Sequence, residues 1–298
     1  MSVFQGAGVA IATPMKGDLS VNYEEFARLI DFQIDNGTDA IIVCGTTGES
    51  ATLSEEEHVE VIRFCVEHVN HRVPVIAGAG SNATDTAIML SQEAEKIGAD
   101  AVLSVTPYYN KATQGGLIAH FTAIAEAISI PVIMYNVPGR TGCNIQPETA
   151  VSLVRDVKNI VGIKDAAGSL AQTTEMMSLA RRQHVDIELY SGEDGLIVPI
   201  LSLGGLGVIS VLSNVAPRQT HDLCARYFAG DTKGAAQMQL DALPLVDALF
   251  CEVNPIPVKR ALSLIGFDCD AIRLPLTRIS AAHEEQLKTA MREYGLIK

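Results

Sequence analysis

Short apolar runs recur along the chain about every 20 to 35 residues, roughly the length of a strand–helix unit. There are eight of these runs, and most are rich in Val and Ile without polar alternation, which is typical of strands covered on both faces. They cover residues 8–13, 39–45, 74–80, 100–106, 131–137, 160–165, 187–192 and 205–211. Eight buried strands that alternate with helices predict an α/β fold, the (β/α)8 barrel.

The segments between these runs carry helix signals. Ser54 followed by Glu57 is a capping-box pattern. Pro147 and Pro217 suit the first turn of a helix, and Gly98 stands where a helix should end. An open, doubly wound sheet is the structural alternative, but no Gly-x-Gly-x-x-Gly loop follows the first run, which weakens it.

The last part of the chain is helical in pattern, over 232–250, 257–265 and 280–294. No linker separates it from the eight units. We therefore expect a catalytic barrel over 1–230 and a C-terminal helical extension over 231–298 that packs on it.

Composition narrows the class of partner and the compartment. The net charge of -13 argues against nucleic acid or an anionic membrane as the main partner. The apolar stretches are shorter than the roughly 20 residues of a membrane span, and we expect no signal peptide. The six scattered cysteines, with no Cys-x-x-Cys, predict reduced thiols in a cytoplasmic protein. No histidine has metal-ligand spacing, so we expect neither a metal nor a cofactor.

Lys164 is the most informative single residue, because it ends an apolar run that reads as a buried strand. Burial removes the hydration of an ammonium, lowers the lysine pKa and favours the neutral amine. A neutral amine attacks carbonyl carbons and forms Schiff bases. The alternative is a lysine that reaches water or pairs with Asp165.

Polar residues cluster where other predicted strands end, and catalytic residues of such barrels lie at the carboxyl ends of the strands. Each segment alone could be a turn, a packed phenol or a surface arginine, but their joint occurrence at five strand ends favours an active site. The segments are Gly45-Thr46-Thr47-Gly48-Glu49-Ser50, Thr106-Pro107-Tyr108-Tyr109-Asn110, Tyr135-Asn136-Val137-Pro138-Gly139-Arg140-Thr141-Gly142, Lys164 and Ser191-Gly192-Glu193-Asp194.

Together these motifs resemble the dihydrodipicolinate synthase and N-acetylneuraminate lyase family of lysine-dependent aldolases, over essentially the whole chain. The Thr-Thr-Gly-Glu segment and Lys164 mark the family broadly, and the segment from Tyr135 to Thr141 resembles its dihydrodipicolinate synthase branch. The resemblance implies that Lys164 forms a Schiff base with pyruvate. The resulting enamine then attacks L-aspartate 4-semialdehyde to give 4-hydroxy-tetrahydrodipicolinate, the branch point of diaminopimelate and lysine biosynthesis.

The resemblance also implies roles for other residues. Tyr135 transfers protons through Thr47 and Tyr109, and Tyr109 comes from a neighbouring subunit, so we expect a homo-oligomer, a tetramer built of two dimers. Thr46 and Thr47 bind the pyruvate carboxylate, and Arg140 binds the carboxylate of the semialdehyde. Backbone groups of two further residues line the site, Gly192 and Ile209.

Two other functions are compatible with parts of this pattern. Another pyruvate-dependent aldolase, acting on sialic acid or 2-keto-3-deoxy sugar acids, would share Lys164, Tyr135 and Thr47. Arg140 argues against it, because polyhydroxylated substrates need hydroxyl partners more than a carboxylate clamp. A non-catalytic ligand-binding paralogue should have lost the lysine, the tyrosine or the threonine, and this chain has all three.

Lysine-sensitive bacterial members of the family have an effector site at a dimer interface. Glu55 stands where they carry a histidine, and Thr86 where they carry the glutamate that receives the α-amino group of the effector. A partly buried ammonium needs a carboxylate partner, so we expect weak or no inhibition by L-lysine. The remnant of this site comprises Ser50, Ala51, Glu55, His58, Asn82, Thr86 and Tyr108.

Overall fold

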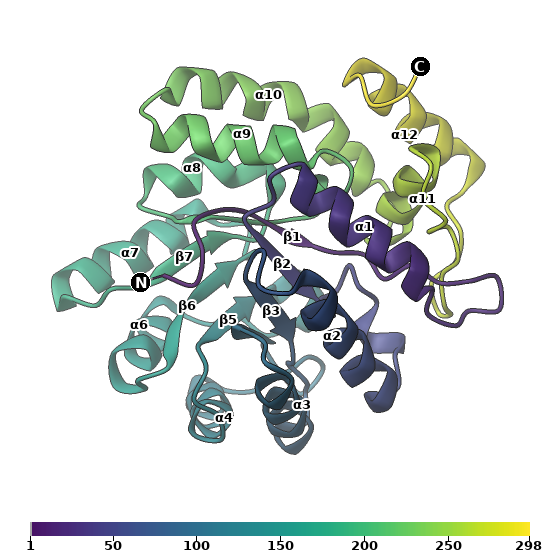
Figure 1. The fold of residues 1–298 in the computed structure, drawn as a ribbon. Coiled ribbons are helices and arrows are strands. Elements are labelled where there is room, and N and C mark those ends of the chain that lie inside the picture. The colour runs from purple at the N-terminus through teal and green to yellow at the C-terminus, as the bar shows by residue number, and fades with distance from the viewer. Residues whose placement is uncertain (1) are drawn as a thin grey trace.

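Eight parallel strands close into a barrel in the order of the sequence (Figure 1). The computed structural model describes residues 2–298, so Met1, the first residue of the expected barrel segment, lies outside the described residues. All eight strands lie in or overlap the predicted runs, so the barrel prediction is confirmed and the open sheet is wrong. The strands are β1 (Gly6–Ala10), β2 (Ala40–Val43), β3 (Val75–Gly78), β4 (Ala101–Val105), β5 (Val132–Asn136), β6 (Ile160–Asp165), β7 (Glu188–Ser191) and β8 (Gly207–Ser210).

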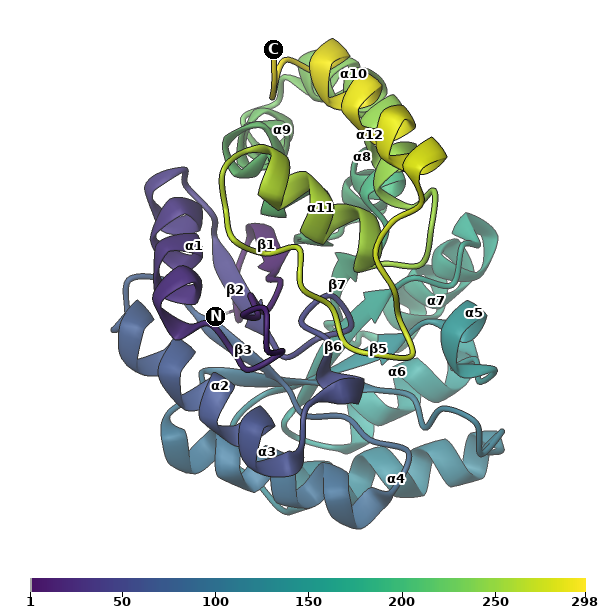
Figure 2. The same ribbon diagram turned by 90° about the vertical axis from the view of Figure 1, so that its right-hand side faces the viewer.

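Helices follow the strands on the outside of the barrel (Figures 1 and 2). The predicted capping box is present, with Ser54 and Glu57 bonded to each other's backbone at the start of α2. Pro147 and Pro217 open α6 and α9, and Gly98 caps α3 at a φ of 98°. The helices are α1 (Tyr23–Asp35), α2 (Glu55–Val69), α3 (Thr84–Ile97), α4 (Gln114–Glu126), α5 (Pro138–Thr141), α6 (Pro147–Asp156), α7 (Leu170–Gln183), α8 (Ile197–Ser202) and α9 (Pro217–Phe228), with 3-10 turns η1 (Ser50–Thr52), η2 (Asp194–Leu196) and η3 (Leu212–Asn214).

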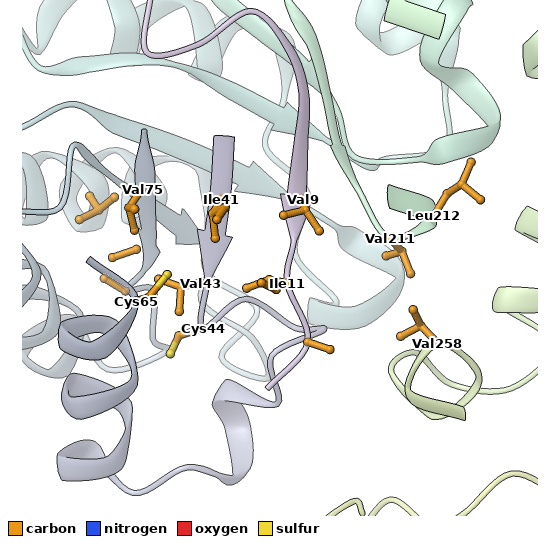
Figure 3. Packing of buried hydrophobic residues seen from close by; sticks show 14 of the residues in the cluster. Val9, Ile11, Ile41, Val43, Cys44, Cys65, Val75, Val211, Leu212 and Val258 are labelled. Atoms are coloured by element: carbon orange, nitrogen blue, oxygen red, sulfur yellow. The ribbon is translucent and has the colours of Figure 1, made fainter. Parts of the chain in front are cut away.

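The strand side chains fill two cores, which explains why the sequence shows no polar alternation. On β2, Ile42 points into the barrel and packs in the cluster that includes Ile133 and Tyr190. Its neighbours Ile41 and Val43 belong to the outer cluster, beneath the helices (Figure 3). Both faces of β2 are therefore apolar, as expected for a strand of a parallel sheet covered on both sides.

The C-terminal segment folds into the three predicted helices, α10 (Thr232–Leu249), α11 (Ile256–Leu264) and α12 (Ala281–Glu293). Helix α10 packs along α9 and also contacts α11 and α12 (Figure 1). Val258 of α11 lies in the same buried cluster as Val211 and Leu212, which follow β8 (Figure 3). The tail is thus joined to the carboxyl end of the barrel. Among residues 2–298, no helix is long and apolar enough to cross a membrane.

Candidate active site

A cavity of about 420 Å³ lies at the carboxyl ends of the strands, with α10 and the segment after it as one wall. Strand ends from different parts of the sequence converge here, because all eight strands of the barrel run in one direction. Six of the residues expected in the site line this cavity: Thr46, Thr47, Tyr135, Arg140, Lys164 and Gly192.

Lys164 lies on β6 with its side chain directed into the cavity, and the residue is only 6% exposed. Burial lowers the pKa of Lys164 to about 8, the charge of Asp194 acts to raise it, and that of Arg140 lowers it further. The alternative pairing with Asp165 is wrong, because the Asp165 carboxylate accepts hydrogen bonds from Thr173 Oγ1 (2.6 Å) and the Ala167 amide (3.1 Å). Near neutral pH, Lys164 is therefore a neutral amine far more often than a lysine with the ordinary pKa of 10.5.

Tyr135 lies beside Lys164, on the neighbouring strand β5. Burial raises the pKa of the Tyr135 phenol, whereas the charge of Arg140 and a hydrogen bond with Thr46 lower it. Thr47 Oγ1 accepts a hydrogen bond from Asn254 Nδ2 at 3.0 Å.

Two of the expected site residues do not line the cavity. Tyr109 is 89% exposed, and its backbone N–H donates to the carbonyl of Thr141. Ile209 lies on β8 with its side chain in the barrel interior. A single chain therefore does not bring the Tyr109 phenol to Tyr135. This is expected if a neighbouring subunit supplies the phenol.

The loop that carries Thr46 and Thr47 is held from both ends of the sequence. Thr13 Oγ1 donates to the carbonyl of Gly48 at 2.8 Å. Glu49 adopts the left-handed conformation, with φ of 57°, and such strain persists only where surrounding contacts enforce it. Its buried carboxylate pairs with Lys259 of α11 and accepts the backbone N–H of Arg273.

Asp194 is a further buried group of the site, with no role predicted from the sequence. Its Oδ2 accepts the backbone N–H groups of Val211 and Leu212, both at 2.9 Å. Burial raises the pKa of Asp194, while these bonds, Ser210 and the charge of Lys164 lower it. Asp194 therefore lies close enough to the lysine to act on its charge.

Three residues in or beside the site were given no role from the sequence, namely Asn254, Lys259 and Asp194. Asp194 belongs to the segment Ser191-Gly192-Glu193-Asp194, so its position after a predicted strand was a usable signal. Lys259 offered a weaker one, a lysine within the apolar pattern of a tail helix. Asn254 gave no signal, because its partner Thr47 is 207 residues away.

The residues expected in the effector site lie around η1, α2, α3 and the loop after β4, and none lines the cavity. His58 is buried, and its Nε2 lies 2.7 Å from the carbonyl of Gly78. Asn82 Nδ2 donates to Asn110 Oδ1 at 3.1 Å, while Tyr108 is 40% exposed. Within residues 2–298, no group of three or more His, Cys, Asp or Glu side chains is placed to hold a metal ion.

Comparisons with known proteins match this chain to one family over nearly its whole length. The model of the dihydrodipicolinate synthetase family matches residues 3–294. A 4-hydroxy-tetrahydrodipicolinate synthase of Lachnoclostridium phytofermentans is 60% identical, with 100% of each chain covered. A solved dihydrodipicolinate synthase from Thermotoga maritima has a TM-score of 0.97 and 45% identity, and covers 99% of this chain and 100% of its own. The structure of a monomeric dihydrodipicolinate synthase variant has a TM-score of 0.96 and 45% identity, with 99% of this chain and 98% of that one covered.

Proposed function

The chain belongs to the dihydrodipicolinate synthetase family, and we propose that it uses Lys164 to condense pyruvate with L-aspartate 4-semialdehyde. It is an enzyme of the lyase type, and its product is 4-hydroxy-tetrahydrodipicolinate, in lysine and diaminopimelate biosynthesis. The observation that carries the proposal is the buried Lys164, with a pKa of about 8, in a cavity that also holds Arg140. An amine activated by burial supplies the nucleophile, and a guanidinium supplies a partner for a carboxylate.

The reaction begins when the neutral amine of Lys164 attacks the ketone carbon of pyruvate. Loss of water from the carbinolamine leaves an iminium, whose positive charge acidifies the pyruvate methyl group. Removal of a methyl proton gives an enamine, and its carbon attacks the aldehyde carbon of the semialdehyde. The amino group of the semialdehyde then attacks the iminium carbon, which closes the ring and releases Lys164.

Tyr135 is the residue we assign to proton transfer, with Thr47 and a Tyr109 from a neighbouring subunit. A tyrosine is poorly acidic in water and needs charged or hydrogen-bonded partners to move protons near neutral pH. Burial raises the pKa of Tyr135 overall, and the nearby charge of Arg140 acts to lower it. The exposure of Tyr109 supports its use by a second copy of the chain.

The substrate contacts follow from the lining of the cavity. We assign Thr46 and Thr47 to the pyruvate carboxylate, with the backbone of Gly192 beside it. The role of the Ile209 backbone is carried over from the family resemblance, because Ile209 does not line the cavity. Arg140, which is exposed and lines the cavity, is assigned to the carboxylate of the semialdehyde. Pyruvate consumption should be measured with L-aspartate 4-semialdehyde and, in parallel, with N-acetylmannosamine or a sugar-derived aldehyde. Preference for either of the latter would overturn the substrate assignment.

The proposal extends to the assembly of the protein and to its cellular compartment. We propose a homotetramer built of two dimers, with the chain divided into a barrel over 1–230 and an extension over 231–298. The cysteines are free and mostly buried, which supports a reducing, cytoplasmic compartment.

L-lysine should inhibit weakly or not at all, because Thr86 offers no carboxylate for the effector. An activity titration with millimolar L-lysine tests this.

A further inference from the structure

The C-terminal extension reaches into the cavity at Asn254, in the segment between α10 and α11. The Asn254 amide Nδ2 donates to Thr47 Oγ1 at 3.0 Å, and both residues line the cavity. Asn254 is 4% exposed and Thr47 is 2% exposed, so bulk water does not compete for this bond. The bond therefore couples the extension directly to a residue assigned to the reaction.

A donor at this position fixes the direction in which the Thr47 hydroxyl bonds. A hydroxyl has one proton and two acceptor lone pairs, and Nδ2–H occupies one of the lone pairs. The proton of Thr47 must then point elsewhere. The side chain lines the cavity beside Tyr135 and Lys164, so this proton is available to the phenol or to bound pyruvate.

The loop that carries Thr47 is held in place, and Asn254 meets it through its donor end. On one side, Glu49 follows Thr47 in the loop, and its carboxylate is paired with Lys259 of α11. On the other side, Asn254 Oδ1 is buried and has no hydrogen-bond partner among residues 2–298, so within that range the amide is engaged through its donor end. The extension thus sets the position of the loop through Lys259 and the orientation of one hydroxyl through Asn254.

We propose that Asn254 is a positioning residue that holds the Thr47 hydroxyl as a hydrogen-bond donor into the active-site cavity. This inference rests on the proposed function, in which Thr47 takes part in proton transfer and pyruvate binding. It extends that function by giving the C-terminal extension a role in it, the orientation of the Thr47 hydroxyl.

A double-mutant cycle between these two residues tests the proposal. Turnover is measured for the wild type, Asn254→Ala, Thr47→Val and the double variant, with pyruvate and semialdehyde both saturating. Loss of one buried hydrogen bond should lower kcat of Asn254→Ala about tenfold. The same substitution should change kcat little when Thr47 is already valine, because its effect passes through the hydroxyl.

The direction of the bond is tested by Asn254→Asp, which keeps the shape of the side chain but replaces the donor by an acceptor. The Thr47 hydroxyl should then donate to the new carboxylate, and kcat should fall at least as far as in Asn254→Ala. The matched control is Asn159→Asp, since Asn159 Nδ2 also donates only to the protein, to the carbonyls of Ala125, Ile128 and Ile130, away from the cavity. It should lower the melting temperature and leave kcat unchanged.

Three results would overturn the proposal: full kcat in Asn254→Ala, an equal loss of kcat in both Thr47 backgrounds, or full kcat in Asn254→Asp. Failure of the proposed function gives a different result, because the wild type would then form no product from pyruvate and semialdehyde. Wild-type activity is therefore measured first.

Discussion

The ammonium nitrogen of Lys164 lies 4.3 Å from the centre of the Tyr135 ring. The two residues are register partners on the neighbouring strands β6 and β5, so backbone hydrogen bonds fix their separation. The aromatic face can favour the charged form of the lysine without carrying a full negative charge. The nucleophile and the proposed proton carrier are thus positioned by the same pair of strands.

The rate of pyruvate adduct formation should rise with pH, with a midpoint near 8. Below that pH the amine of Lys164 is protonated and cannot attack, and its pKa is lowered to about 8. Arg140→Gln removes a positive charge that lowers this pKa, so the midpoint should move to higher pH. Single-turnover borohydride trapping across pH 6 to 10 measures both profiles. A midpoint that stays in place in the variant would show that Arg140 does not act on the lysine, and Arg155→Gln, at an exposed position, is the control.

Arg140→Ala should weaken use of the semialdehyde and, at a pH well above the Lys164 midpoint, leave pyruvate adduct formation largely intact. A lost hydrogen bond to a charged group costs about 1.5 to 3 kcal/mol, or roughly 10- to 150-fold in kcat/KM for that substrate. Arg140→Lys keeps the charge but loses the paired donors, so it should restore only part of the loss. Steady-state kinetics with each substrate varied in turn decide the matter, and unchanged kcat/KM for the semialdehyde would contradict the assignment.

Lys259→Met should destabilise the protein by about 3 to 5 kcal/mol, because it leaves the buried carboxylate of Glu49 without its partner. Adding Glu49→Gln should recover part of this loss, since the unpaired charge is then removed. Urea midpoints at one fixed protein concentration give the comparison. Lys96→Met breaks an ion pair on the surface and should shift the midpoint little. An equal shift of the urea midpoint in the two lysine variants would show that the buried ion pair stabilises the protein no more than the surface pair does.

The active enzyme should be a dimer or larger, because a phenol supplied by a neighbouring subunit cannot act in a monomer. Sedimentation velocity at assay concentrations measures the assembly, and Tyr109→Phe should reduce kcat while leaving the assembly unchanged. A monomer with full activity would exclude the shared tyrosine.

The strands and helix starts were predictable because their signals are local. Runs of Val and Ile mark strands covered on both faces, and the capping box at Ser54 depends only on a residue three positions later. Lys164 was predictable for the same reason, as a charge at the end of an apolar run.

The contacts made by the tail were not predictable in this way. Lys259 meets Glu49 across 210 residues, and nothing near either residue in the sequence indicates the other. The hydrogen bond from Asn254 to Thr47 likewise joins residues 207 positions apart, and it depends on side-chain orientations in the folded protein. Contacts of this kind depend on tertiary packing, which local sequence signals do not indicate.

The central claim is that Lys164 carries the substrate, and mass mapping after borohydride reduction tests it most directly. Reduction in the presence of pyruvate should add one pyruvyl group to the peptide that contains Lys164. Lys164→Ala should form no adduct and lose most of its turnover while keeping its fold, as judged by circular dichroism. An adduct on another lysine, or turnover without any adduct, would contradict the account.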